Sequence, residues 1–179
     1  MKKADLSRFH YFLGPRVTVI VTAGEKPNSM VASWVSPVSF DPPMVGVAIG
    51  ESRFTHQKIA ESGQFTISTV TKDIAKDADR LGHSHGHKSD KYKGVKLKPE
   101  KTPAGWILKG AAVNIACRLS GSYKIGDHTW FVGEVKEILV DEKKDDGVGI
   151  KPTEILYWRQ SKDLEDTWTL KPRENLSKN

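Results

Sequence analysis

The sequence predicts a mainly β protein, a β-barrel with short helices, and three observations favour this fold class. Apolar β-branched residues alternate with polar residues in several short runs, which is typical of half-buried strands. Turns rich in Gly and Pro separate these runs after a few residues. Only two segments place their apolar residues at helical spacing. Because the chain has 179 residues, 37% of them hydrophobic, we expect one domain, residues 1–160, followed by a tail, residues 161–179.

The first half of the chain is expected to form three neighbouring strands, Arg16–Ala23, Asn28–Ser39 and Met44–Ile49. β-branched residues fill the first strand, and small polar and apolar side chains alternate along the second. Gly24–Pro27 and Asp41–Pro43 supply the turns. Connections this short are typical of antiparallel neighbours.

Two short helices are expected at Phe54–Glu61 and Asp73–Leu81. Both have apolar residues at helical spacing, and Gly63 and Gly82 stand where each helix should end. A further strand, Gln64–Val70, separates the two helices.

The second half predicts a long β-hairpin. Ala111–Tyr123 and Thr129–Val140 are the longest strand patterns, and Ile125–His128 between them is typical of a tight turn. The stretch Gly82–Gly105, rich in Gly, His, Lys and Pro, is assigned mostly to a loop. After Glu154–Arg159 comes a polar tail, whose Trp168 we expect to pack against the barrel or a dimer partner.

Composition excludes several classes of protein. The longest apolar runs are too short to cross a bilayer, and polar residues interrupt the stretch that would form a signal peptide, so we expect a cytoplasmic protein without a membrane partner. The single Cys117 excludes a disulfide scaffold. A net charge of +6 favours anionic ligands, which include nucleic acids and phosphate-bearing cofactors. Acidic residues are interleaved with the basic ones, so nucleic acid is the weaker alternative.

Two groups of histidines attract interest. His83, His85 and His87 alternate and could bind Zn or Ni, but no matching Cys or paired acidic ligands accompany them, so we expect a solvated loop and no metal site. His128 lies beside Asp127 at the predicted hairpin turn, where a hydrogen-bonded turn residue is the simpler interpretation. The sequence contains no Walker loop, dinucleotide-binding glycine motif or recognisable Ser-His-Asp triad.

Two segments have the residues of a ligand site. Where a strand leads into the first helix, Ser52, Arg53 and Thr55 could bind a phosphate at the helix N-terminus, although Ser52 or Thr55 could equally be an ordinary N-cap. The small residues of 28–36 would let a flat ligand approach the backbone, and Trp34 could either cover that ligand or belong to the core.

Four motifs occur in an order that resembles a known family: Asn28–Trp34, Ser36–Pro43, Ser52–Thr55 and Gly126–Val135. Together they are similar to the flavin reductase-like, FMN-binding split-barrel proteins, and most of all to the flavoredoxins among them. The likeness spans roughly residues 9–159, and 89–92 resembles a family loop ending in Asp-Lys-Phe. His85-Gly86-His87 departs from the Ser-Gly-Arg often found there.

The resemblance implies a homodimeric, Greek-key-like split barrel of six strands that binds FMN non-covalently near the subunit interface. The residues expected at FMN are Asn28, Ser29, Met30, Val31, Ala32, Ser33, Trp34, Ser36, Ile49, Gly50, Ser52, Arg53, Thr55, Lys91, His128 and Trp158. Lys91 is expected to stabilise the charge of reduced flavin, and His128, the one catalytic residue assigned, to orient the flavin or an incoming nicotinamide.

The implied function is an oxidoreductase that passes electrons from NAD(P)H or a redox protein through FMN. A non-catalytic FMN-binding electron carrier is the first alternative, favoured if Trp34 and Trp158 cover the flavin face. A nucleic-acid-binding barrel is the remote alternative, which predicts salt-dependent oligonucleotide binding and no bound flavin.

Overall fold

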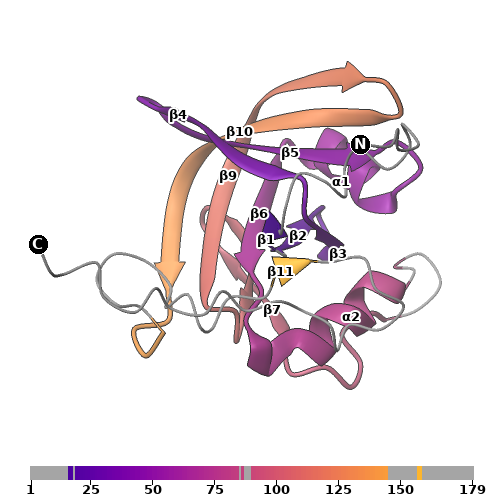
Figure 1. Cartoon of the computed structure of the whole chain (residues 1–179), viewed down its shortest axis with the longest axis vertical. Coiled ribbons are helices and arrows are strands. Elements are labelled where there is room, and N and C mark those ends of the chain that lie inside the picture. Colours follow the sequence, from indigo (N-terminus) through magenta and orange to yellow (C-terminus); the bar gives the residue numbers. More distant parts are fainter. Residues whose placement is uncertain (1–15, 18, 85, 87–89, 145–156, 159–179) are drawn as a thin grey trace, which may run out of the picture.

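The computed structural model describes residues 16–17, 19–84, 86, 90–144 and 157–158, with the backbone alone for residues 16, 17, 157 and 158. Figure 1 shows two long strands, β9 and β10, curving around the molecule, with both helices on one side of it. The strands are β1 (Arg16–Val17), β2 (Val19–Ala23), β3 (Asn28–Ala32), β4 (Val35–Phe40), β5 (Pro43–Gly50), β6 (Gln64–Thr69), β7 (Lys98–Thr102), β8 (Gly105–Lys109), β9 (Val113–Ile125), β10 (His128–Val140) and β11 (Tyr157–Trp158). The helices are α1 (Phe54–Ser62) and α2 (Ala75–His83), the latter preceded by the 3₁₀ turn η2 (Lys72–Ile74).

The main sheet has seven antiparallel strands in the order β3-β2-β6-β9-β10-β5-β4. Its edge strands β3 and β4 would lie about 29 Å apart if the sheet were flat. Only Ser33 and Trp34 join them, and a connection of this length spans at most roughly 11 Å. The sheet is therefore rolled into a barrel. The Ala48 amide donates to the Trp34 carbonyl oxygen at 2.9 Å, which extends the pairing of β4 with β5. The predicted β-barrel with short helices is confirmed.

Several details of the prediction are wrong. Asn28–Ser39 is two strands rather than one, because the chain crosses from one sheet edge to the other at residues 33–34. The main sheet has seven strands instead of six. The stretch Gly82–Gly105, predicted to be mostly loop, also contains β7, which pairs with β8 in a separate hairpin. Arg16–Val17 belongs to β1, which pairs with β11 rather than with the main sheet.

The barrel interior is packed with apolar side chains from both halves of the chain. Strand β2 is buried along its whole length, because Val19 and Val21 face this interior while Ile20 faces a second apolar cluster outside the barrel. The interior cluster comprises Val19, Val21, Ala23, Val45, Val47, Ile49, Ile59, Phe65, Ile67, Cys117 and Phe131. Burial raises the pKa of the Cys117 thiol to about 12, so this thiol is an unreactive core group.

Helix α1 follows β5 after a three-residue turn. The predicted end is confirmed: Gly63 adopts a left-handed conformation with φ 65° and its amide donates to the Ile59 carbonyl oxygen. The predicted N-cap is wrong, because Arg53 occupies that position without a side-chain cap. His56 Nε2 lies 2.8 Å from Thr129 Oγ1, which ties α1 to β10.

Helix α2 covers the outer face of β2 and β3. Its buried Leu81 packs with Ile20 and with Leu97 from the segment after the helix. The helix continues through Gly82 to His83, so the prediction that Gly82 ends it is wrong. A Cβ at Gly82 would lie 3.2 Å from Val31 Cγ2, so this glycine permits close packing of the helix on β3.

The hairpin of β9 and β10 is confirmed, with Gly126 and Asp127 between the paired residues Ile125 and His128. Gly126 has φ 63°, the conformation that such a turn requires. Within the described residues, no helix has the length and apolar character needed to span a bilayer.

Candidate functional site

Asn28 and Thr55 meet where the first residue of β3 faces the first turn of α1. Asn28 Nδ2 donates to Thr55 Oγ1 at 2.6 Å, and both side chains are buried. Asn28 Oδ1 is also buried but has no hydrogen-bond partner among the described residues. A buried carbonyl without a donor is unfavourable by about 1–3 kcal/mol, so this oxygen is poised to accept a hydrogen bond from a ligand.

Lys91 approaches the next residue of β3. Its ammonium donates to the Ser29 carbonyl oxygen, and only 7% of the residue's surface is exposed. Burial lowers the Lys91 pKa to about 8. No described carboxylate forms an ion pair with Lys91, so the site contains a largely buried cation that a ligand's acceptor atoms can bind.

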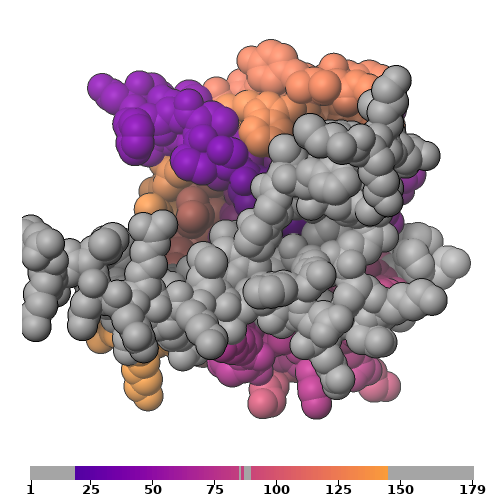
Figure 2. Space-filling view, in the orientation of Figure 1, coloured from indigo at the N-terminus to yellow at the C-terminus, as the bar shows by residue number. Residues whose placement is uncertain are grey.

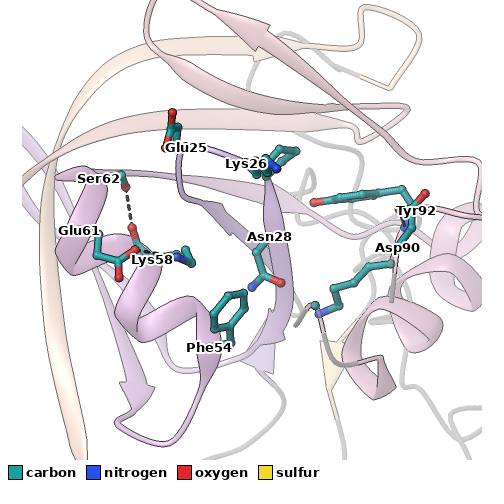
Figure 3. A pocket seen from close by; sticks show the side chains of 12 residues that line it. Glu25, Lys26, Asn28, Phe54, Lys58, Glu61, Ser62, Asp90 and Tyr92 are labelled. Atoms are coloured by element: carbon teal, nitrogen blue, oxygen red, sulfur yellow. Dashed lines mark hydrogen bonds and ion pairs between the residues drawn. The ribbon is translucent and has the colours of Figure 1, made fainter. Parts of the chain in front are cut away.

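A cavity of about 470 Å³ opens beside these two residues. Figure 3 shows Asn28 between Phe54 of α1 and Tyr92 of the segment after α2. The remaining walls come from the turn before β3, from α1 and from Gly86, and the full lining is Glu25, Lys26, Pro27, Asn28, Phe54, Lys58, Glu61, Ser62, Gly86, Asp90, Lys91 and Tyr92.

Two contacts shape this cavity. A Cβ on Gly86 would lie 2.0 Å from Asn28 Oδ1, so the close approach of this backbone to β3 requires glycine. On the opposite wall, the Lys58 ammonium lies 2.6 Å from Glu61 Oε2 and, through this hydrogen bond, lowers the pKa of the Glu61 carboxyl. Lys58 is thus already paired, in contrast to Lys91.

A second group of predicted residues lies at the turn of the β9–β10 hairpin. His128 pairs with Gly50 across β10 and β5, and its Nδ1 lies 2.7 Å from Asp127 Oδ1. This hydrogen bond lowers the pKa of the Asp127 carboxyl. The His128 ring stacks on Trp34 at a centroid distance of 4.7 Å.

Arg53 joins that group. A Cβ on Gly50 would lie 3.7 Å from His128 Nε2 and 3.9 Å from Arg53 Cγ, so these side chains flank one backbone position. The Arg53 amide donates to the Gly50 carbonyl oxygen at 3.0 Å, which turns the chain from β5 into α1. The first turn of α1 holds no acidic residue and no side-chain cap, and the exposed Ser52 and Arg53 directly precede it. This is the arrangement in which helix N-termini bind anions.

The other predicted residues contribute differently. Met30 and Ala32 pack against the barrel interior, Val31 packs under α2, and Ile49 is a fully buried core residue. The side chain of Ile49 therefore serves packing alone, whereas those of Met30, Val31 and Ala32 are only partly buried. Ser33 is half-buried, and Ser36 on β4 donates to the Pro37 carbonyl oxygen.

Some predictions fall outside the described residues. Trp158 pairs with Arg16 through its backbone, but its side chain lies outside them, as do His85, His87 and the tail with Trp168. His83 Nδ1 lies 3.0 Å from an Asp79 carboxylate oxygen. The described part of the chain holds no cluster of three metal-ligating side chains.

Sequence reasoning missed Phe54, Lys58, Gly86 and Tyr92. In the sequence, Phe54 and Lys58 are indistinguishable from ordinary helix residues. They line the cavity because α1 packs against β3. Tyr92 had a usable signal, since it directly follows Lys91 in the predicted cofactor loop.

Comparison with known proteins places this site in context. The family described as "Flavin reductase like domain" matches residues 13–163. A Rhodococcus NADH-dependent flavin reductase is 30% identical over 135 residues, which cover 70% of each chain. The solved structure of an FMN-binding protein from Thermus thermophilus has a TM-score of 0.79 and 29% identity, covering 88% of this chain and 89% of the other. A flavoredoxin from Methanosarcina acetivorans has a TM-score of 0.85 at 23% identity, covering 99% of this chain and 95% of the other, which shows the same fold.

Proposed function

The chain belongs to the flavin reductase-like family, and from this premise we propose that it is an FMN-binding oxidoreductase. It takes electrons from a reduced nicotinamide or a redox protein and passes them on through FMN. Bound FMN supplies the redox chemistry, while the protein binds, orients and tunes it.

The observation that carries the proposal is the pairing of an unsatisfied acceptor with a buried cation at one cavity. The pyrimidine edge of a flavin presents an N–H donor between carbonyl acceptors. Asn28 Oδ1 lacks a donor, and the Lys91 ammonium is a donor without a carboxylate partner among the described residues. These groups are complementary to that edge, so the residues present fit the cofactor.

Each residue of the site then has its own role in binding FMN. Lys91 lines the cavity, and its ammonium would stabilise the negative charge that reduction builds on a bound flavin. Arg53, at the start of α1, binds the phosphate of FMN. Thr55, buried against Asn28, holds the amide in place.

Reduced nicotinamide is the electron donor we favour, because the Rhodococcus relative is an NADH-dependent flavin reductase. His128 and Trp34 stack on each other beside Gly50, where they can align an incoming nicotinamide ring. The same stacking supports the second candidate, an electron carrier whose flavin face is covered and that reacts only with protein partners.

We also propose a homodimer located in the cytoplasm, with a second copy of this chain covering strand β4. This strand forms one edge of the sheet and exposes Val38 and, to 99%, Phe40. Figure 2 shows this violet segment projecting at one corner of the molecule. Trp34, 36% exposed, lies next to the same strand, so a partner here would also approach the site.

The deciding experiment is titration of the purified apoprotein with FMN, FAD and riboflavin, followed by anaerobic addition of NADH and NADPH. We expect tight FMN binding, weaker riboflavin binding because the phosphate contact is lost, and bleaching of the flavin by one nicotinamide. Bleaching only by a reduced redox protein would favour the carrier. Absence of flavin binding would overturn the proposal.

A further inference from the structure

Two adjacent residues, Lys91 and Tyr92, both bind Ser29 of β3, but through different groups. The Lys91 ammonium donates to the Ser29 backbone carbonyl oxygen, while the Tyr92 hydroxyl lies 2.8 Å from Ser29 Oγ. Ser29 Oγ also lies 2.7 Å from Thr22 Oγ1 on β2. The three hydroxyls form a chain that connects the segment after α2 to two strands of the barrel.

Besides its hydroxyl, Tyr92 uses its ring and its backbone to contact neighbouring groups. Its ring packs against the apolar cluster under α2, its amide donates to Asp90 Oδ1 at 2.9 Å, and its carbonyl oxygen accepts from Lys98 Nζ at 2.9 Å. Burial raises the pKa of the Tyr92 hydroxyl to about 12, so it remains a neutral hydrogen-bonding group at any physiological pH.

Lys91 has no such support of its own. Its ammonium, at the end of four methylene groups, has one hydrogen bond to a described residue, the Ser29 carbonyl oxygen. The charged groups that line the cavity around it are Glu25 and Lys26 before β3, Lys58 and Glu61 on α1, and Asp90. None of these described carboxylates forms an ion pair with Lys91, so its placement depends on the backbone it shares with Tyr92.

We propose that Tyr92 is a positioning residue, whose hydroxyl, through Ser29 and Thr22, holds the Lys91 ammonium buried at the cavity wall. This inference deepens the proposed function and rests on it, because the position of Lys91 affects the reaction only when flavin occupies the cavity. The Asp-Lys-Phe motif that this loop resembles lacks the hydroxyl, so the anchor belongs to this chain's own sequence.

The test compares Tyr92→Phe with Tyr123→Phe, the same chemical change on an exposed residue of β9. Lysine labelled at the ε-carbon allows the Lys91 pKa to be followed by NMR in the flavin-free protein, with Lys91→Met assigning the signal. We expect a pKa of about 8 in the parent and in Tyr123→Phe. In Tyr92→Phe the pKa should rise towards its usual value, because the loosened ammonium reaches water. FMN affinity at pH 7 should fall about fivefold in Tyr92→Phe alone.

Ser29→Ala provides a second route to the same result, because it removes the hydroxyl that Tyr92 binds but keeps the carbonyl that Lys91 binds. A raised Lys91 pKa in either folded variant supports the inference even if no protein binds FMN, an outcome that would contradict only the proposed function. An unchanged Lys91 pKa in a folded variant would overturn the inference, whatever happens to FMN binding.

Discussion

The buried wall of the cavity and the exposed turn of the β9–β10 hairpin place their charged groups in opposite environments. On the wall, Lys91 is 7% exposed, and burial alone shifts its pKa. At the hairpin turn, the Asp127 side chain is 93% exposed, and its pKa shifts mainly through one hydrogen bond to His128. The wall can therefore influence a ligand strongly through electrostatics, whereas solvent screens the charge at the turn, so the main effect of the turn residues is to align a ligand.

Lys91→Met should produce the largest effect, because it removes the buried cation and keeps the size of the side chain. We expect FMN affinity to fall about 10- to 100-fold, the range for a hydrogen bond to a charged group. Isothermal titration would measure this, with Lys109→Met, an exposed residue of β8, as the control. Equal affinity in both variants would mean that the wall does not act through charge.

The same lysine predicts how the stability of the apoprotein depends on pH. The folded-state pKa of about 8 is below the usual 10.5, so between these values the unfolded chain binds more protons than the folded one. The contribution of Lys91 to the free energy of unfolding should therefore rise with pH across this window. Urea denaturation at several pH values should show the rise in the parent and a smaller one in Lys91→Met. The same rise in both proteins would place its origin elsewhere.

Arg53→Ala should have a smaller effect, because Arg53 is exposed and solvent weakens its contribution. We expect about tenfold weaker FMN binding with unchanged riboflavin binding, since only FMN carries the phosphate. Thr55 is unsuitable for this test, because its loss would also leave Asn28 Nδ2 without its partner. Arg118→Ala, an exposed arginine on β9, is the control. Parallel losses for FMN and riboflavin would contradict a phosphate contact.

The oligomeric state tests whether a second copy of the chain covers the exposed edge of β4 in solution. Light scattering should give twice the 19.9 kDa chain mass, and Phe40→Asp on the exposed edge of β4 should shift the protein towards the monomer. A monomeric parent at micromolar concentration would show that β4 has no partner copy.

Much of the barrel was predictable because apolar and polar residues alternate along most of its strands. The turn at Gly126 and the helix end at Gly63 also follow local backbone rules. The strand break at Ser33–Trp34 was hidden, since it arises from closure of the barrel and leaves the alternating pattern intact. The polar, Pro-containing segment Lys98–Thr102 becomes a strand only by pairing with β8, and Gly82 is explained only by its contact with Val31.

In the candidate site too, local features were predictable from the sequence, and contacts between distant segments were not. Ser52, Arg53 and Thr55 were identifiable because hydroxyl and guanidinium groups at a strand-to-helix junction can bind a phosphate. That Thr55 faces Asn28, and that Tyr92 reaches Ser29, depends on how segments distant in sequence pack together. Contacts across 27 and 63 residues leave no periodic signal in a single sequence.

His128→Ala should have the smallest effect on binding. Its ring stacks on Trp34 and bonds Asp127, but it does not line the cavity, so FMN affinity should stay within about twofold of the parent. Reduction by the nicotinamide should slow about tenfold, because the incoming ring loses one aligning surface. Stopped-flow bleaching at matched FMN occupancy measures this rate, with His83→Ala, an exposed histidine at the end of α2, as the control. Since alignment needs no proton transfer, adding imidazole should not restore the rate. Restoration by imidazole would instead make His128 a proton donor or acceptor, and an unchanged rate would leave it a structural residue of the hairpin.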